Sequence, residues 1–295
     1  MAPSLTVNRR EVRLTNLQRI LWPEEELTKR DLIRYYIQVA PYLLPHLANR
    51  PLVVQRFPRG IHGEGFYQKN IPAGAPCWLT TCPVSHREGK VTRYVVAENL
   101  ETLVWLGNQA CLELHPWLSS LNHLERPDFC VFDLDPMENS TFDQVRQVAQ
   151  AIRDTLEALG LKSYPKLSGA TGIQIYLPVK PLYTYDQVRR FAEVVCLRVH
   201  ELLPEITSLA RAVGERGGKV YLDYLQNVYG KTLAAPYSPR PLPGAPVSMP
   251  LDWSEVGPGG PAPGDFTILN ALPRLERYGD RFAPVLEEKQ ELPLI

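Results

Sequence analysis

The hydrophobic and polar positions of this chain follow two different periods along its length. Residues 28–44 show helical spacing behind a Thr28–Asp31 capping pair, and the apolar stripe consists of Leu32, Tyr35, Tyr36 and Val39. Short apolar runs bounded by Gly and Pro, such as RPLVVQRF and VTRYVV, predict strands. Because helices and hairpin-like strand pairs are mixed without strict alternation, the pattern predicts an α+β fold.

The remaining elements follow from the same signals. Helices are predicted from Asn99 through NLETLVWLGNQACLEL, from Ser140 to Gly160, over 184–203 behind Thr184, and around 265–278. The predicted inner side of the Ser140–Gly160 helix carries Val145, Val148, Ile152, Leu156 and Leu159. Strands are predicted at CVFDLDP, KVYLDYLQN and TLAAPYS, and on both sides of the turn SGATG. The Pro-rich segment 239–264 is expected to wrap the surface.

Composition narrows the class of protein. The 295 residues are 44% hydrophobic and 22% charged with zero net charge, which excludes a bulk polycation but not a local basic groove. Five cysteines without paired spacing are expected to be buried thiols rather than a zinc site. Neither a signal peptide nor an apolar run of roughly 18 residues is visible, so we expect a cytoplasmic, nucleoid-associated protein without a membrane partner. We expect one domain over 1–295.

The stretch FCVFDLDP carries two acids one residue apart. On a strand, Asp133 and Asp135 point to the same face while Leu134 points into the core, so the carboxylates could hold one or two divalent cations. A pair of acids that caps a strand end would look the same. An EF-hand is excluded because Glu138 and Gln144 stand where Gly and Glu are needed. Met137 argues against a haloacid-dehalogenase-like phosphatase, in which Thr or Val would be expected two residues after the second Asp. Nucleotidyl transfer remains if a third carboxylate exists.

Asp223 is the candidate third carboxylate. It ends the apolar run VYLD, where an isolated acid is costly unless it is paired or bound to a cation. The nearby groups suited to phosphate oxygens are Arg216, Gln226, Lys231 and Arg240. Pairing with Arg216 or Lys219 is the structural alternative. The turn SGATG, in the same way, is compatible with an anion-binding nest or with an ordinary hairpin.

Several spaced stretches together resemble the polymerase domain of bacterial DNA ligase D, a member of the archaeo-eukaryotic primase superfamily. They follow one order: LTNLQRILWPEEELTKRDLIRYY, RFPRGIHGEGFYQKNIPAGAP, ELHPW, RPDFCVFDLDP, SGATGIQIYLP and VYLDYLQNVYGKTLAAPYSPRPLPGAPVSMPLDWSEV. The resemblance implies an archaeo-eukaryotic primase fold, in which an N-terminal α/β module packs on an RRM-like catalytic β-sheet with flanking helices.

The resemblance also implies roles for individual residues. Asp133, Asp135 and Asp223 match three catalytic acids that bind two divalent ions, Mn²⁺ or Mg²⁺, with Asp223 next to the primer 3′-hydroxyl. Positions that match nucleotide-binding groups are His115, Ser168, Arg216, Gln226 and Arg240, to which we add Lys231. Arg19 and Lys29 match a pair that grips a 5′-phosphate. Phe66 and Tyr67 match aromatic residues that stack near the template, with Lys69 beside them.

Two positions depart from the family pattern. Thr171 stands where a Lys of the Gly-rich turn is common, and Gln174 stands where a His is common. Triphosphate binding is therefore expected to depend more on Lys231 and the arginines, while Thr171 and Gln174 remain candidate nucleotide-binding positions.

The expected function is template-directed extension of primer ends or filling of gaps, with ribonucleotides preferred, in non-homologous end joining. The substrates are NTP or dNTP and gapped or primer–template DNA with a 5′-phosphate. Ku and a separate DNA ligase are partners implied by family habit, since the chain is expected to act as a standalone polymerase. The alternatives are a catalytically weak DNA-end-binding scaffold and a metal-dependent phosphohydrolase.

Overall fold

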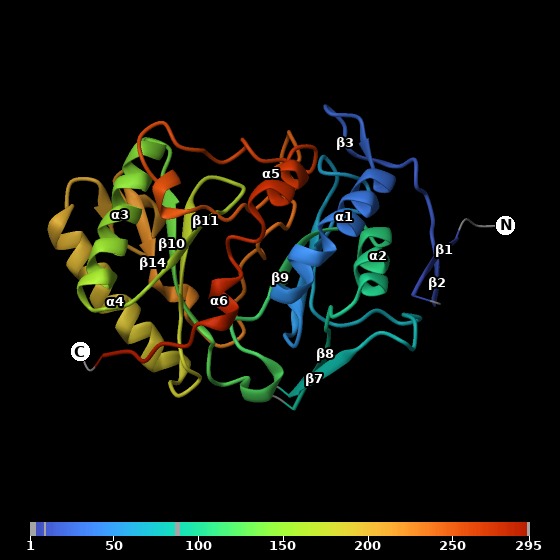
Figure 1. Cartoon of the computed structure of the whole chain (residues 1–295), viewed down its shortest axis with the longest axis horizontal. Coiled ribbons are helices and arrows are strands. Elements are labelled where there is room, and N and C mark those ends of the chain that lie inside the picture. The colour runs from blue at the N-terminus through green and yellow to red at the C-terminus, as the bar shows by residue number, and fades with distance from the viewer. Residues whose placement is uncertain (1–3, 9, 86–88, 294–295) are drawn as a thin grey trace. The chain divides into compact units, whose positions relative to one another are not determined.

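The computed structural model describes residues 4–8, 10–85 and 89–293, and the chain divides into two compact units (Figure 1). Unit 1 takes residues 1–117, 232–248 and 266–279, and unit 2 takes 118–231, 249–265 and 280–295. Each unit is thus assembled from three separate segments of the chain. The expectation of one domain over 1–295 stays a prediction.

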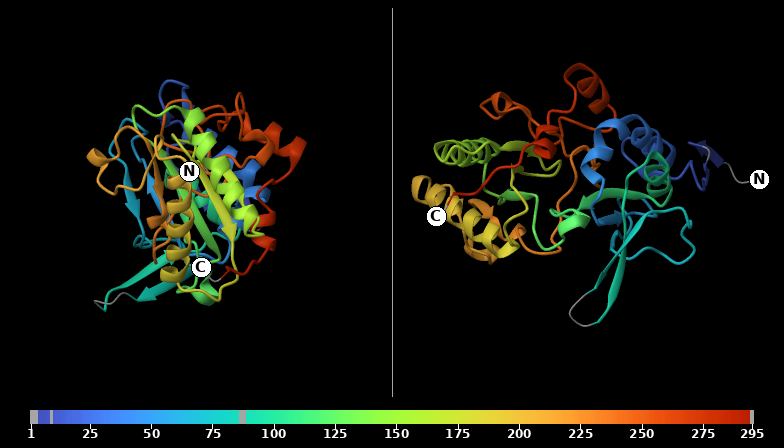
Figure 2. Two further views of the ribbon diagram at one scale, coloured as in Figure 1. Left: turned by 90° about the vertical axis from the view of Figure 1, so that its left-hand side faces the viewer. Right: turned by 60° about the horizontal axis from the view of Figure 1, so that its bottom comes forward.

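Unit 1 is built on a sheet whose central strand is β5 (Leu52–Arg56). Its other strands are β6 (Phe66–Gln68), β7 (Thr81–Ser85), β8 (Val91–Val95) and β9 (Cys111–Pro116). Figure 2 shows β7 and β8 as a long antiparallel hairpin. Two smaller hairpins pair β1 (Ser4–Val7) with β2 (Arg10–Arg13) and β3 (Ile20–Trp22) with β4 (Leu27–Thr28). The helices are α1 (Lys29–Leu47), α2 (Leu100–Asn108) and α5 (Ala271–Tyr278).

Helix α1 confirms the predicted start and inner face. Thr28 and Asp31 form a capping box, which satisfies backbone N–H groups at the first turn. The predicted stripe is buried against α2 and the sheet. Two prolines, Pro41 and Pro45, lie inside the helix without ending it before Leu47.

The predicted helix from Asn99 through CLEL is too long. The helix ends at Asn108, Ala110 adopts a positive φ of 54°, and Cys111 then begins strand β9. The left-handed residue reverses the chain so that β9 pairs with β5. Because CLEL is a continuous apolar run, its pattern could not distinguish a buried strand from the end of a helix.

Unit 2 is built on a five-stranded sheet in the order β11-β12-β10-β14-β13. The strands are β10 (Phe129–Pro136), β11 (Tyr164–Leu167), β12 (Ile173–Pro178), β13 (Thr207–Ser208) and β14 (Val220–Asp223). All neighbours are antiparallel except β13 and β14. Helices α3 (Phe142–Ala158) and α4 (Tyr185–Leu202) lie side by side on the sheet and both contact β10. A short helix, α6 (Pro284–Glu287), contacts β12.

Several predicted details of unit 2 need correction. Thr141, not Ser140, caps α3, and the Ser140 hydroxyl donates to the Gly218 carbonyl instead. Leu159 is 40% exposed because α3 ends before it, although the rest of its predicted stripe is buried. The strand predicted over KVYLDYLQN ends at Asp223, and a 3₁₀ turn follows. In the described part of the chain, 3₁₀ turns lie at Leu121–His123, Val213–Glu215, Tyr224–Gln226 and Trp253–Glu255.

The late part of the chain is more buried and less regular than expected. The stretch TLAAPYS is not a continuous strand: Thr232 makes an isolated bridge to Trp117, and the Ala235 amide donates to the Leu114 carbonyl of β9. The last predicted helix begins at Ala271. Within the Pro-rich segment, Val247 and Met249 are buried, so it does not simply wrap the surface.

The cysteines and the helix lengths bear on two sequence-based expectations. All five cysteines are free, but only Cys111, Cys130 and Cys196 are buried, while Cys77 is exposed and Cys82 half-buried. Among the described residues, no helix combines the length and the apolar character that crossing a bilayer requires.

Candidate active site

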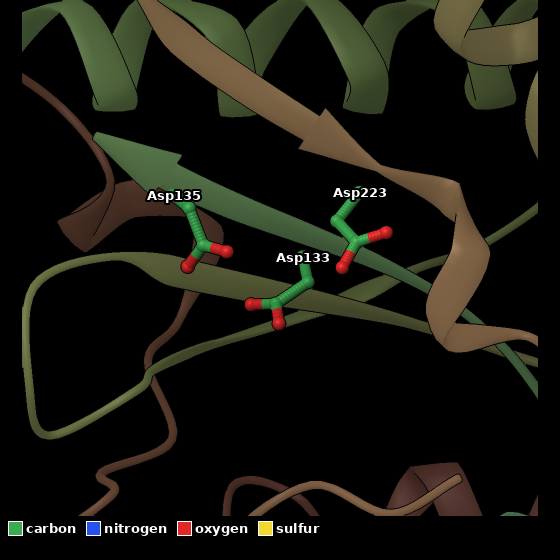
Figure 3. A group of neighbouring side chains, drawn as sticks. All are labelled: Asp133, Asp135 and Asp223. Atoms are coloured by element: carbon green, nitrogen blue, oxygen red, sulfur yellow. The ribbon is translucent and has the colours of Figure 1, made fainter. Parts of the chain in front are cut away.

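Three carboxylates meet at the centre of the unit 2 sheet. Asp133 on β10 stands directly opposite Asp223 on β14, and Asp135 lies two residues further along β10 on the same face. One carboxylate oxygen from each lies within 4.8 Å of the others. Figure 3 shows the three side chains converging on the side of the strands that faces away from the helix drawn above them. We call Asp133, Asp135 and Asp223 the acidic cluster.

The electrostatics of the acidic cluster suit a cation. Asp133 is only 5% exposed, and burial together with the repulsion of Asp135 and Asp223 raises its pKa well above the usual range. Its Oδ1 is buried without a hydrogen-bond partner among the described residues. A buried carboxylate oxygen without a donor is costly, and a divalent cation with oxygen ligands removes that cost. The residues present therefore fit a metal site.

Asp223 is held by hydrogen bonds within its own turn rather than by a basic side chain. It accepts hydrogen bonds from the Leu225 amide at 3.0 Å and from Gln226 Nε2 at 3.0 Å. Arg216, the partner that the structural alternative proposed, donates to the carbonyls of Ala210 and Arg211 and stacks on the Tyr221 ring at 3.6 Å. Lys219, the other proposed partner, donates to the Pro204 carbonyl at 2.7 Å. The guanidinium of Arg216 nevertheless stays close to the cluster, because Tyr221 pairs with Asp135 across the sheet.

The turn SGATG presses on the backbone between the two acids of β10. A Cβ at Gly172 would lie 1.9 Å from the Leu134 carbonyl oxygen, so only glycine fits there. The Ser168 hydroxyl accepts hydrogen bonds from the amides of Ala170 and Gly172, which ties up two of the amides that an anion nest would use. Thr171 is exposed at the tip of the turn.

Gln174 lies beside the acidic cluster on the neighbouring strand and is buried. It is 4% exposed and stands opposite Asp133 in the sheet register. Its side chain hydrogen-bonds Asp133 and accepts a hydrogen bond at 2.5 Å from Lys166 on the next strand. Its predicted contact with nucleotide stays a prediction, and its partners in the structure are Lys166 and Asp133 of the acidic cluster.

Unit 1 contains a second cluster of predicted nucleotide-binding residues. His115 and Arg240 both bind the buried carboxylate of Glu113, His115 Nε2 at 2.8 Å and Arg240 Nε at 2.5 Å. Burial alone would raise the pKa of Glu113, but hydrogen bonds and charge from His115 and Arg240 outweigh it and lower that pKa. Because the Glu113 carboxylate can only accept, the Nε2 nitrogen of His115 that bonds to it carries the proton. The exposed ring of Tyr67 lies edge-on to His115 at 5.7 Å.

The residues predicted to grip a 5′-phosphate also meet in unit 1. The β3–β4 hairpin brings Arg19 next to Lys29, whose amide donates to the Arg19 carbonyl at 2.8 Å. Lys29 Nζ donates to the carbonyls of Thr15 and Asn108. Burial, with repulsion from Arg19 and from Arg56 on β5, lowers the pKa of Lys29 to about 8. We call Arg19, Lys29 and Arg56 the basic cluster.

The other predicted contacts with nucleic acid or nucleotide are at the surface. Phe66 is 44% exposed and Tyr67 60% exposed on strand β6, and the Arg56 guanidinium lies over the Phe66 ring at 5.4 Å. Lys69 follows β6 and is exposed, as is Lys231 in unit 2. Exposed rings beside cations are the usual platform for stacking nucleobases.

Sequence reasoning missed three charged residues that support these clusters: Glu113, Arg56 and Lys166. The signal for Glu113 was its period-two spacing from His115 in the buried strand CLELHP. Arg56 and Lys166 each end or interrupt an apolar strand, but only the sheet register shows what they contact.

Comparison with known proteins agrees with this arrangement. Residues 28–282 match the family model described as LigD, primase-polymerase domain. The bifunctional non-homologous end joining protein LigD of Bacillus subtilis is 36% identical over 96% of this chain, which spans 46% of that protein. The multifunctional LigD of Mycolicibacterium smegmatis is 33% identical over 93% of the chain and 36% of its own length. The chain thus spans between about a third and about half of these two relatives.

A solved structure shares the fold. The polymerase domain from Mycobacterium tuberculosis ligase D in complex with DNA matches with a TM-score of 0.87 and 30% identity, covering 95% of this chain and 99% of that one. This match supports the archaeo-eukaryotic primase fold expected from the sequence. Since the family model covers most of the chain and the acids converge, the chain belongs to the LigD primase-polymerase domain family, a family of nucleotidyltransferases.

Proposed function

We propose that the chain adds nucleotides to primer ends, and fills gaps, in DNA repair by non-homologous end joining, with two divalent cations and with ribonucleotides preferred. The observation that carries the proposal is the convergence of Asp133, Asp135 and Asp223 from two adjacent strands, with Asp133 Oδ1 buried and available for a ligand. Two divalent cations, Mn²⁺ or Mg²⁺, would supply activation of the 3′-hydroxyl and neutralise charge on the leaving pyrophosphate.

The side chains of the acidic cluster divide the work by their surroundings. Asp223, tied to its turn by Leu225 and Gln226, is a rigid ligand for the attacking side of the reaction. Asp133 and Asp135 would hold the cation that neutralises charge on the triphosphate. Ser168, Thr171 and Lys231 in the same unit offer hydroxyl and ammonium donors, while Arg216 offers a guanidinium beside Tyr221. A donor already held in place, as Arg216 is on Tyr221, stabilises developing charge without reorganising during the reaction.

For unit 1 we propose two binding roles. Glu113 holds His115 and Arg240 in a preset orientation to bind the incoming nucleotide. The basic cluster binds the 5′-phosphate at a gap, where a bound anion would offset the burial and the mutual repulsion that together lower the pKa of Lys29. Phe66 and Tyr67 stack on bases, and Lys69 contacts the backbone. The DNA complex of the M. tuberculosis domain supports nucleic acid as the ligand. Ku and a separate ligase remain proposed partners.

A single assay tests the proposal. Labelled DNA with a gap of a few nucleotides and a 5′-phosphate is incubated with the protein, Mn²⁺ or Mg²⁺, and either NTP or dNTP. We expect lengthening that depends on template and metal, stops with EDTA, and is stronger with ribonucleotides. Binding without lengthening would favour a scaffold. Release of phosphate from simple esters without template would favour a phosphohydrolase.

A further inference from the structure

A row of four polar side chains crosses the unit 2 sheet at one level. The register pairs Lys166 on β11 with Gln174 on β12, Gln174 with Asp133 on β10, and Asp133 with Asp223 on β14. Directly opposed residues of adjacent strands share one face of the sheet. The row therefore begins at a buried ammonium and ends at two acids of the candidate metal site.

We propose that Lys166 is a positioning residue for Asp133, acting through the side-chain amide of Gln174. The proposal deepens the proposed function, on which it rests, by explaining how one metal ligand is aimed. Lys166 Nζ donates to Gln174 Oε1 at 2.5 Å, and the Gln174 side chain hydrogen-bonds Asp133.

The chemistry of the three groups sets the direction of these bonds. A glutamine amide by itself could turn either its oxygen or its nitrogen toward Asp133. An ammonium group has only donors, so Lys166 requires the Gln174 oxygen on its side. The Gln174 N–H groups then face Asp133 and donate to its carboxylate. Without Lys166, the amide would be free to rotate and set oxygen against oxygen.

The consequence reaches the cation site through the two oxygens of Asp133. The Gln174 amide therefore fixes the orientation of the Asp133 carboxylate. Oδ1 of that carboxylate, which has no hydrogen-bond partner among the described residues, is left for a cation. A histidine at position 174, the residue common in the family, could do the same, accepting from Lys166 at one ring nitrogen and donating to Asp133 from the other.

The burial of Lys166 argues against a purely structural role, because burying an ammonium group costs free energy. Its exposed fraction is 0%, and its Nζ lies 5.7 Å from the centre of the Tyr176 ring. An apolar residue of similar length would fill this space without the cost of desolvating an ammonium. A positive charge so near the acidic cluster also repels a metal ion. Charge alone thus predicts tighter metal binding when Lys166 is replaced, whereas positioning predicts weaker binding.

Mn²⁺ binding without DNA or nucleotide separates these predictions. Free Mn²⁺ is measured by electron paramagnetic resonance for wild type, Lys166→Met, Gln174→Leu and the double variant. We expect each single variant to bind Mn²⁺ about 10-fold or more weakly, as is usual when support of a metal ligand is lost. The double variant should bind no more weakly than Gln174→Leu, because both changes break one chain of contacts.

Controls make the outcome unambiguous. Lys162→Met, which removes an exposed lysine of the same unit, should bind like wild type, and thermal unfolding should show that every variant is folded. If Lys166→Met does not fold, Gln174→His takes its place and should recover most of the affinity that Gln174→Leu loses. The inference is wrong if Lys166→Met binds Mn²⁺ as well as or better than wild type, if the two losses add, or if Gln174→His rescues nothing.

Failure of the proposed function gives a different result. Asp133→Asn serves as the reference for loss of the site. Wild type that binds Mn²⁺ no better than Asp133→Asn overturns the metal-dependent function and this inference together. Asp133-dependent binding that ignores Lys166 overturns the inference alone.

Discussion

The acidic cluster of unit 2 and the basic cluster of unit 1 both gather like charges, but they are supported differently. Asp133 lies in the middle of a sheet, 5% exposed, with Gln174 and Lys166 aligned behind it on consecutive strands. The basic cluster joins an exposed arginine, Arg19, to a buried lysine, Lys29, at the end of a two-stranded hairpin.

This difference has a physical reason. A divalent cation requires ligands held within narrow limits of distance, which adjacent strands provide through their register. A phosphate accepts hydrogen bonds from many directions, so a hairpin and the end of a strand are sufficient. Both clusters raise the energy of the ligand-free protein and would be relieved by a ligand of opposite charge. The following predictions test that view.

The largest effect is expected on catalysis from the acidic cluster. Asp133→Ala should lower the rate of nucleotide addition by a factor on the order of 10³ or more, because bound metal contributes several kcal/mol of transition-state stabilisation. DNA binding should change little, since the arginine and lysine side chains that bind the DNA phosphates lie outside the acidic cluster. Primer extension and fluorescence anisotropy measure the two properties. Asp154→Ala, an exposed acid on α3, is the matched control. Extension by Asp133→Ala under Mn²⁺ would refute the assignment.

The next effect concerns recognition of the 5′-phosphate by the basic cluster. Arg19→Ala should remove most of the preference for a 5′-phosphorylated gap over a 5′-hydroxyl gap, a loss of roughly 10-fold if the charge-assisted hydrogen bond is worth about 1.5 kcal/mol. It should also lower the slope of log affinity against log salt by about one unit. Arg34→Ala, an exposed residue on α1, is the control. An unchanged preference for phosphate would count against this site.

A smaller effect is expected on the stability of the metal-free protein. Asp133→Asn should raise the free energy of unfolding by about 1–3 kcal/mol in EDTA, because it removes a buried acid whose pKa is raised. Because its pKa is raised, Asp133 keeps its proton in the folded state up to a higher pH than in the unfolded state. The gain in free energy of unfolding from Asn should therefore grow as pH rises above the usual pKa of Asp. Thermal unfolding at pH 5 and 7.5 measures this advantage. Saturating Mn²⁺ should then stabilise wild type but not the variant. Wild type as stable as Asp133→Asn in EDTA would show that the acids are not strained.

The smallest effect is a pH dependence at Lys29. Its pKa is lowered to about 8, so the ammonium is charged below that pH and loses its charge above it. The affinity for a 5′-phosphorylated gap, compared with a 5′-hydroxyl gap, should therefore weaken as pH rises from 7.5 to 9.5. Lys29→Met should start weaker and show little change over this range. Anisotropy titrations across these pH values measure both. A wild-type preference that is flat with pH would argue that Lys29 does not contact the phosphate.

The sequence predicted the local elements wherever a pattern had one interpretation. The capping box at Thr28 and the stripe on α1 are as expected, and so are the strands that carry Asp133 and Asp223. It failed where an apolar run was compatible with two structures, as at CLEL, where a left-handed Ala110 ends the helix and starts a strand. The strand predicted at TLAAPYS is not formed, because its residues meet the end of β9 only singly: Thr232 bridges Trp117, and the Ala235 amide donates to the Leu114 carbonyl.

The sequence by itself determined which residues can do chemistry: two acids at period two, a third acid in an apolar strand, and the basic pair Arg19 and Lys29 that the family resemblance singled out. Only the tertiary structure decided their partners, because strand order and register bring together residues far apart in the chain. Register puts Asp223 opposite Asp133, and it turns Gln174 toward that acid with Lys166 behind it. No local pattern contains that information, since side chains on different strands meet only after the sheet has formed.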